Sequence, residues 1–269
     1  MTDLYTSDYY LNSVGGVEFF RAYGCRVLKP AFQAAVVRSE LKLPMKVLDV
    51  GCGRGELAAR LASLGYEAVG IDPAEDAVRI ARESFPGVRF EAVTMGKLER
   101  PAGGFDRIFC LGTIEHLTDG EIDTLFKDAE RLLSRDGLFI VSTCINRFYY
   151  KFWSYGLRRA IARLLRGLGL DVRDPSPPRS EEDGKVHVNE QSFSRLKRVG
   201  ASRGWTADVQ VLPNPKLCLD RLYGGELPAN FPLRGKSPWA CRLSGLFFFF
   251  PLSLFLGRSY IALYRRPTP

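Results

Sequence analysis

Apolar and polar positions alternate in blocks along residues 45–145. Short apolar runs such as KVLDVG, EAVGID and FDRIFCLG are each followed by a longer segment in which apolar residues recur every three or four positions. The short runs are typical of buried strands, and the longer segments are typical of amphipathic helices. Strand and helix in repeated succession predict βαβ units, and therefore a mostly parallel sheet with helices on both faces.

The pattern also places the element boundaries. Strands are expected over 46–51, 67–72, 88–93, 105–112 and 137–144, with helices over 55–64, 74–85 and 119–134. After Cys144 the rhythm breaks into a basic aromatic helical stretch over 148–168 and a Pro-rich polar loop over 171–185. A helix over 190–203 follows, with Asn189 as its expected N-cap. Strands 205–212 and 259–266 then form a terminal hairpin that leaves the last strand antiparallel.

Three further segments complete the expected organisation. Residues 1–40 form an N-terminal cap of short helices with an aromatic cluster at Tyr9, Tyr10, Phe19, Phe20 and Tyr23. Residues 41–269 form the main domain, interrupted by insertions over 146–189 and 213–257. These insertions and the cap are expected to cover an acceptor pocket, because the sheet itself supplies only one side of a site.

Composition indicates a cytoplasmic protein whose basic charge is local. The N-terminus has no basic start and no apolar core of a secretory signal, and the six cysteines form no CxxC pair. The chain carries a formal charge of +8. Residues 147–170 and 227–269 contain 12 of the basic residues and no acid, so the rest of the chain carries −4. Such segments suggest an anionic surface as a partner.

The clearest chemical signal is VLDVGCGRGELAARLASLGYEAVGID. Asp49 ends the first strand, and Gly51, Gly53 and Gly55 then form a tight turn into a helix. Glycine permits both the sharp bend and the close approach of a ligand to bare backbone. Asp72 ends the second strand, where an acid accepts hydrogen bonds from ribose hydroxyls. The plain alternative is that the glycines form only a turn.

A nicotinamide-dinucleotide site is the nearest competitor. Its fingerprint requires glycines at 51, 53 and 56, and position 56 is Glu56. A carboxylate at Asp49 is also a poor neighbour for a pyrophosphate. The pattern instead favours a ligand with a ribose, an amine and a cationic centre but no phosphate.

The motif DVGCGRG, with Asp72 and FDRIFCLGTIEHL in order, resembles the class I S-adenosylmethionine-dependent methyltransferases. The resemblance covers about residues 45–145 and the final hairpin. It implies a Rossmann-like, doubly wound, seven-stranded and mostly parallel α/β sheet with a C-terminal antiparallel hairpin. It also implies S-adenosylmethionine as the cofactor. The residues expected to contact this cofactor are Asp49, Gly51, Cys52, Gly53, Gly55, Asp72, Pro73, Thr94, Met95 and Leu111.

Methyl transfer is an in-line displacement in which positioning supplies much of the rate, and a base is needed only when the acceptor retains its proton. The chain has two histidines. His116 follows the fourth strand in TIEHL, and His187 lies before a helix. We expect His116, Glu115 and His187 to be the catalytic residues, with oxygen as the favoured nucleophile. The alternative is that both histidines have only a structural role and pack or cap loops.

The IEHL sequence also resembles the ubiquinone-biosynthesis O-methyltransferases. That resemblance implies a Glu-x-x-Glu-His cluster able to bind a divalent metal. Here the first Glu position is Gly112, which leaves Glu115 and His116. Two ligands make a weak site, so no required metal is predicted.

Two aromatic and basic segments indicate a membrane surface or a lipid-linked acceptor. Residues 148–168 predict an amphipathic helix with a cationic face, and 239–256 is an apolar run interrupted by Pro251 and too short to span a bilayer of about 30 Å. The ubiquinone-type enzymes also carry a membrane-contacting insertion after the fifth strand. The alternative is that both segments pack on the sheet or form a dimer interface.

The expected activity is therefore methylation of a small or lipid-linked acceptor. No nucleic-acid partner is expected, because the basic segments are apolar and the Asn/Asp-Pro-Pro-Tyr signature is absent after the fourth strand. The alternatives are N- or C-methylation of a natural-product scaffold and a protein that binds the cofactor without turnover.

Overall fold

A single twisted sheet forms the centre of the molecule. The computed structural model describes residues 5–143, 149, 153–175, 187–212, 223, 253, 255, 257 and 259–266. Its seven strands have the order β3-β2-β1-β4-β5-β7-β6, and β7 alone is antiparallel to its neighbours. The predicted doubly wound sheet and terminal hairpin are thus confirmed. The strands are β1 Lys46–Val50, β2 Glu67–Asp72, β3 Arg89–Ala92, β4 Phe105–Leu111, β5 Leu133–Thr143, β6 Thr206–Leu212 and β7 Ser259–Arg265.

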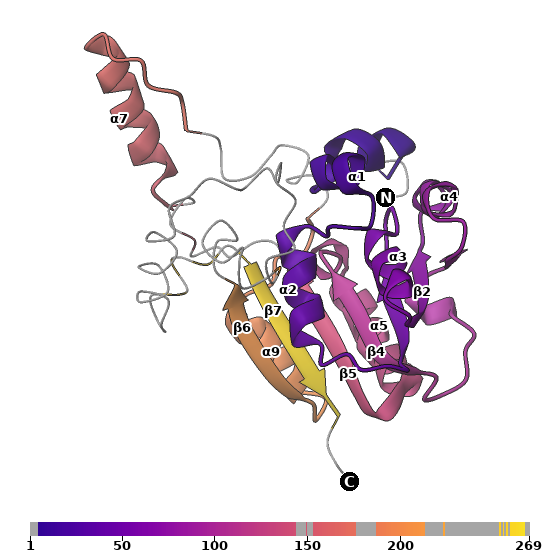
Figure 1. Cartoon of the computed structure of the whole chain (residues 1–269). Coiled ribbons are helices and arrows are strands. Elements are labelled where there is room, and N and C mark those ends of the chain that lie inside the picture. Colours follow the sequence, from indigo (N-terminus) through magenta and orange to yellow (C-terminus); the bar gives the residue numbers. More distant parts are fainter. Residues whose placement is uncertain are drawn as a thin grey trace.

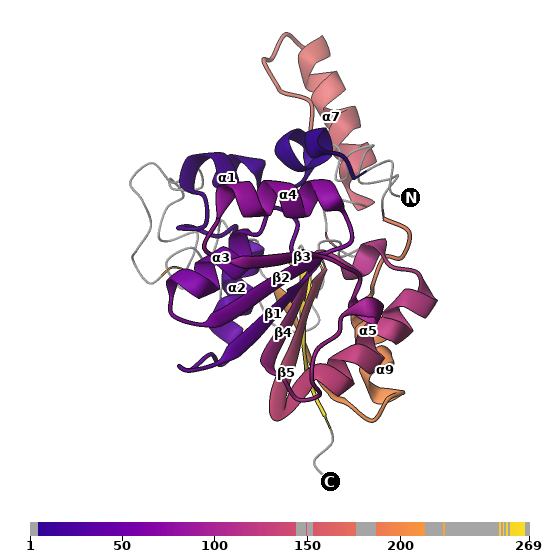
Figure 2. The same ribbon diagram turned by 90° about the vertical axis from the view of Figure 1, so that its right-hand side faces the viewer.

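Helices cover both faces of this sheet (Figure 2). On one face α5 and α9 contribute buried residues to one hydrophobic cluster, and on the other face α2, α3 and α4 contribute to a second cluster. The described helices are α1 Val17–Tyr23, α2 Pro30–Arg38, α3 Glu56–Ser63, α4 Glu75–Ser84, α5 Asp119–Leu132, α7 Tyr155–Gly167 and α9 Phe193–Ala201. Three short helical elements complete the described structure: the π-helix η2 Tyr9–Ser13 ahead of α1, and the 3₁₀ helices η3 Met95–Lys97 after β3 and η4 Ile114–His116 after β4.

Four aromatic residues pack the terminal hairpin onto the sheet. Phe126 of α5 contacts Phe139, Trp205 and Tyr264 edge-on, with ring centroids 5.0 to 6.0 Å apart. The buried hydroxyl of Tyr264 donates to the carbonyl of Leu196 at 2.8 Å. Edge-on aromatic pairs add stability beyond their buried area. The hairpin is therefore part of the core, although it is distant in sequence from the strands that it covers.

Two local predictions are wrong. The strand expected from residue 137 begins at Leu133, which is buried and pairs with Phe105 before the register shifts near Arg107. Strand β5 therefore also takes up Leu133 and Ser134, which were expected to end the helix over 119–134. The cap of α9 is Ser192, whose hydroxyl accepts from the backbone of Arg195, and not Asn189.

The helix α7 stands away from the rest of the molecule in both views (Figures 1 and 2). Ala162 is its one buried side chain, whereas Leu157, Ile161 and Leu164 are exposed. It covers the later part of the predicted helical stretch 148–168, and residues 148 and 150–152 lie outside the described residues. The second segment, 239–256, also lies outside them except for Ser253 and Phe255, as does most of insertion 213–257.

Candidate active site

The glycine turn connects β1 to α3 at the carboxyl edge of the sheet. Gly51, Gly53 and Gly55 all have positive φ angles, of 70°, 52° and 82°. A Cβ atom on Gly51 would lie 2.3 Å from Thr113 Oγ1, and one on Gly55 would lie 2.5 Å from the Phe90 ring. Residues other than glycine are strained at these positive φ angles, and at Gly51 and Gly55 their side chains would also overlap these neighbours. The turn therefore needs glycine both for its backbone shape and for its packing.

Two backbone hydrogen bonds hold the turn against the second strand. The N–H groups of Gly51 and Cys52 both donate to the carbonyl of Ile71, at 2.8 and 2.9 Å. The Cys52 side chain is buried, and its pKa is raised because burial and the nearby Asp49 disfavour the thiolate. Cys52 thus contributes backbone geometry and a neutral thiol to the predicted cofactor site.

Asp72 lies beside this turn with its carboxylate directed into the loop. Its Oδ2 accepts from Gly53 N at 3.0 Å, and its Oδ1 accepts from Ala74 N at 2.9 Å. The hydroxyl of Tyr10 donates a further hydrogen bond to it. Burial nevertheless raises the pKa of Asp72, since the desolvation of the carboxylate outweighs these donors. A carboxylate accepts about four hydrogen bonds, so a ribose hydroxyl would share this group with Tyr10 or displace it.

Asp49 forms the second carboxylate of the site. It is buried, and its pKa is raised to about 8 by desolvation and then by the charges of Glu56 and Asp72. A backbone hydrogen bond from Ala58 and the charge of Lys29 act in the opposite direction. Two buried carboxyl groups beside one turn, Asp49 and Asp72, favour a cationic ligand with hydroxyl groups, because a positive charge stabilises their ionised forms. The residues present therefore fit a sulfonium nucleoside better than a phosphate-bearing one.

The remaining residues predicted for the cofactor lie along the same edge. The register pairs Asp72 with Ala92, which places Thr94 just beyond the end of β3 with an exposed side chain. Pro73 is exposed next to Asp72, whereas Met95 and Leu111 are buried. The structure thus brings these positions to one edge, and their individual contacts with the cofactor remain predictions.

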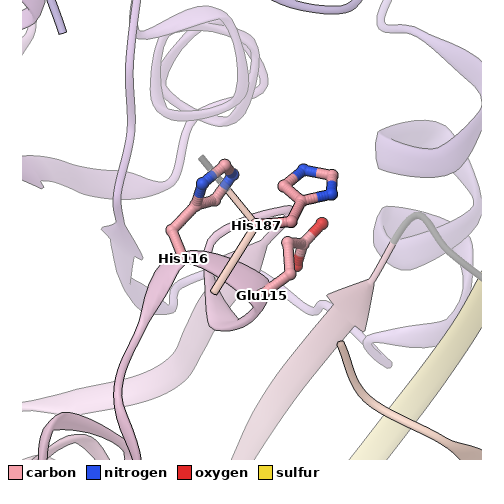
Figure 3. Close-up of side chains that lie close together, drawn as sticks. All are labelled: Glu115, His116 and His187. Atoms are coloured by element: carbon pink, nitrogen blue, oxygen red, sulfur yellow. The ribbon is translucent and has the colours of Figure 1, made fainter. Parts of the chain in front are cut away.

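Glu115, His116 and His187 form a compact cluster at this edge, beyond β4 (Figure 3). One donor atom from each side chain lies within 4.8 Å of those of the other two. The two imidazole rings meet edge-on, with centroids 4.8 Å apart. Glu115 is 1% exposed, and both histidines are half-buried. Sequence reasoning identified all three residues, and the structure shows that they meet.

Local hydrogen bonds explain why this cluster forms. The turn η4 carries Glu115 and His116, and Thr118 follows as the N-cap of α5 in a capping box with Glu121. The backbone N–H of Asn189 donates to the Glu115 carbonyl at 3.0 Å, and its side chain donates to Asp119 Oδ1 at 2.8 Å. Asn189 therefore attaches the segment of His187 to η4 and to the start of α5 instead of capping α9.

Arg54, which was not predicted as a site residue from the sequence, connects the glycine turn to the N-terminal segment. The Arg54 guanidinium, 3% exposed, donates to the Tyr10 carbonyl at 2.7 Å and pairs with Glu56 at 2.7 Å. It also lies 4.9 Å from the ring centroid of Phe20. The aromatic cluster of residues 1–40 indicated that this segment is buried. The sequence pattern could not predict that it packs on the glycine turn.

Comparisons with known proteins agree with this geometry. Residues 47–137 match a family model described as a methyltransferase domain. The ubiquinone biosynthesis O-methyltransferase of Agrobacterium fabrum is 35% identical over 107 residues, which cover 38% of this chain and 42% of that protein. The corresponding enzyme of Bartonella tribocorum is 28% identical over 160 residues, covering 58% of this chain and 63% of that protein. The chain thus spans about half the length of the curated relatives that it matches.

Solved structures show the same fold at low sequence identity. A SAM-dependent methyltransferase from Archaeoglobus fulgidus has a TM-score of 0.56 at 15% identity, covering 93% of this chain and 99% of that chain. A second, from Methanosarcina mazei, has a TM-score of 0.54 at 14% identity, covering 87% and 98%. At these identities the likeness supports the fold alone.

Proposed function

We propose that this chain, whose residues 47–137 match a methyltransferase domain, is an S-adenosylmethionine-dependent methyltransferase that methylates a small or lipid-linked acceptor at oxygen. The observation that carries the proposal is the placement of two sites at one edge of the sheet. The glycine turn with its buried carboxylates lies there, and the cluster of Glu115, His116 and His187 lies there too. One region is suited to a cationic nucleoside, and the other is suited to moving a proton.

The cofactor would be held by the turn and its two acids. Asp72 would accept from the ribose, and Asp49 with the bare backbone of Gly51 and Gly53 would face the methionine half. The bound cofactor supplies a methyl group already activated on a sulfonium. The chain itself then has to align the acceptor oxygen, exclude water and accept the hydroxyl proton.

The first experiment is titration calorimetry with S-adenosylmethionine and S-adenosylhomocysteine. Wild type is expected to bind both, and Asp72→Ala is expected to bind at least tenfold more weakly, since the carboxylate that would accept from the ribose is lost. Asp208→Ala, on the edge strand β6, is the matched control and should bind as wild type does. Absence of binding by folded wild-type protein would refute the proposal.

The proton is assigned to the cluster of two imidazoles and one carboxylate. An imidazole nitrogen is a suitable acceptor near neutral pH, and a neighbouring carboxylate stabilises the imidazolium that forms. The half-buried position of His116 and His187 leaves their rings accessible to an acceptor. The test is transfer of radiolabelled methyl from S-adenosylmethionine to catechol and to a catechol with a long alkyl chain. Labelling of the second compound in preference to the first would support a lipid-linked acceptor.

A metal-assisted version is the second candidate, and the same three side chains favour it. A carboxylate and two imidazoles suit a first-row divalent cation, which would lower the pKa of an acceptor hydroxyl. The sequence pattern offered Glu115 and His116 as metal ligands, and the structure places His187 beside them. The prediction of no required metal is tested with excess chelator. Full activity would support it, and activity lost in chelator but restored by magnesium or manganese would assign the cation to this cluster.

Helix α7 supports contact with an anionic membrane surface, on the cytoplasmic side. Its exposed apolar side chains Leu157, Ile161 and Leu164 alternate with basic residues along the helix. Its basic residues are Arg158, Arg159, Arg163 and Arg166. Apolar side chains that enter the interface, with arginines at the headgroups, are the two contributions that hold such helices on a bilayer. Among the described residues, no helix has the length and apolar character needed to cross a membrane.

Liposome co-sedimentation at low salt tests this contact. Wild type should pellet with phosphatidylglycerol vesicles and not with phosphatidylcholine vesicles. The double variant Leu157→Gln/Leu164→Gln should remain in the supernatant. Leu43→Gln is the matched control, because Leu43 is equally exposed but lies ahead of β1. Equal pelleting of all three proteins would assign the contact to another part of the chain.

A further inference from the structure

Tyr5 reaches the acid–base cluster from the far end of the chain. Its hydroxyl lies 3.2 Å from Nδ1 of His116, although the two residues are 111 positions apart. The two rings also meet edge-on, with centroids 6.1 Å apart. The N-terminal segment therefore contributes a polar group to the site as well as apolar cover.

The segment that carries Tyr5 is anchored to two elements of the cofactor side. Ser7 donates its backbone N–H to Asp76 Oδ2 at 2.7 Å, and Arg79 donates to the Ser7 hydroxyl at 2.7 Å. Arg54 of the glycine turn holds the carbonyl of Tyr10 through a buried bond of 2.7 Å. Because both anchors belong to α4 and to the glycine turn, the place of Tyr5 depends on the cofactor half of the domain.

Ring packing fixes the direction of the Tyr5 side chain. The Tyr5 ring contacts Tyr9 edge-on at 5.5 Å and lies tilted against Tyr10 at 6.5 Å. Tyr10 is itself buried with Ile80. These contacts leave the Tyr5 hydroxyl directed toward His116.

The hydroxyl is protonated at neutral pH. Burial raises the pKa of Tyr5, and the charges of Asp72, Glu121 and Glu115 raise it further. A phenol is a stronger hydrogen-bond donor than a neutral imidazole N–H, and the bare imidazole nitrogen is a strong acceptor. The favoured bond therefore runs from Tyr5 O–H to Nδ1 of a neutral His116.

We propose that Tyr5 is a positioning residue that donates to Nδ1 of His116 and thereby keeps the proton of the neutral ring on Nε2. This inference rests on the proposed function and divides the work within the cluster. His116 then presents an N–H that orients the acceptor oxygen. His187, next to Glu115, accepts the hydroxyl proton.

Nitrogen-15 NMR of the free protein tests the bond without any acceptor. The chain has two histidines, so a histidine-labelled sample in chelator gives two ring systems, and His187→Gln assigns them. Wild-type His116 is expected in the Nε2–H form with a hydrogen-bonded Nδ1. In Tyr5→Phe the Nδ1 and Nε2 signals should move toward the average of the two tautomers. Tyr9→Phe, which keeps the ring cluster, is the control and should match wild type.

Two results would overturn the inference. One is an Nδ1–H form of His116 in wild type, a measurement that needs no variant to fold. The other is identical His116 signals in Tyr5→Phe and wild type.

Turnover gives a second and separate reading. Tyr5→Phe should lower kcat about tenfold or more while the dissociation constant for S-adenosylmethionine stays within twofold, and Tyr9→Phe should change neither. Failure of wild type to bind S-adenosylmethionine would refute the proposed function and leave the NMR result intact. Normal turnover by Tyr5→Phe with a shifted His116 signal would refute the positioning role alone.

Discussion

The cofactor half and the acid–base half of this site are built in different ways. The first is contiguous: Asp49, the glycine turn and Asp72 lie within 24 residues of sequence, and backbone geometry holds them. The second is assembled from η4, the segment of His187 and the N-terminal Tyr5, which meet only in the folded chain. A contiguous site fails when it loses its local backbone shape or one of its own side chains. An assembled site fails when any of several tertiary contacts is lost, and then without loss of the fold.

The sharpest way to separate the halves is to remove the histidines. His116→Gln and His187→Gln should each lower kcat by about 10² to 10⁴, the usual contribution of a positioned acid or base. Because His116 orients the oxygen from which His187 takes the proton, the two rings act as a unit, and the double variant should lose little more than the worse single variant. The dissociation constant for S-adenosylmethionine, measured by calorimetry, should stay within twofold throughout. A parallel loss of cofactor binding would show that the two halves are one unit.

A glycine substitution tests the cofactor half in the opposite sense. Gly55→Ala should reduce the free energy of unfolding by about 2–4 kcal/mol, since a positive φ and overlap with Phe90 and Ala81 both oppose the new methyl group. Cofactor binding should fall with it. Gly87→Ala is the control, because nothing lies within 4 Å of its added Cβ, and it should change stability by less than about 0.5 kcal/mol. Equal urea midpoints for the two variants would contradict the packing argument.

The same difference decides what the sequence could predict. The bounds of β2 and the glycine turn follow from local periodicity and turn chemistry, and the structure has them where they were expected. The early start of β5 was not predicted, because Leu133 belongs to the strand through its pairing with Phe105. Its neighbours in sequence do not indicate this pairing. Ser192 replaced Asn189 as a cap because Asn189 is used in a tertiary contact with Asp119.

The acid–base half was predictable only as separate residues. His116 and His187 drew attention because histidine is rare in this chain, but no local pattern places two rings 71 positions apart at 4.8 Å. Tyr5 drew none, since an aromatic residue near a terminus is ordinarily packing. Side chains that come together from different loops depend on the whole fold. The periodicity of one segment carries no information about such contacts.

A pH series probes the electrostatic character of the cofactor half. Burial holds the pKa of Asp49 at about 8 in the folded chain, against an ordinary value of 3.8. Between these values the folded chain retains a proton that the unfolded chain has released, so this group makes the free energy of unfolding fall as pH rises. The slope is at most about 1.4 kcal/mol per pH unit. Asp49→Asn removes it, and the stability of the variant relative to wild type should therefore grow from pH 5 to pH 8.

Urea denaturation of both proteins at each pH measures this difference. Asp72, whose pKa is also raised, is present in both proteins, so the difference between their curves reports Asp49 and its coupling to Asp72. Parallel stability curves would mean that Asp49 ionises normally and is hydrated. A cationic cofactor should in turn drive Asp49 to release its proton, which calorimetry in buffers of different ionisation enthalpy would detect.

The smallest expected effect concerns the link that assembles the acid–base half. Asn189→Ala removes the bond to Asp119, which is exposed, so stability should change by less than about 1 kcal/mol. The His187 segment keeps the backbone bond from Asn189 to the Glu115 carbonyl, so kcat should fall only a few-fold. Asp119→Ala removes this bond and also the ion pair of Asp119 with Arg195, so its effect should be at least as large. The double variant should add little to Asp119→Ala, because Asn189→Ala removes a bond already lost. Cofactor affinity should be unchanged in all three. Additive losses in kcat would mean that the two residues act independently and not through their shared bond.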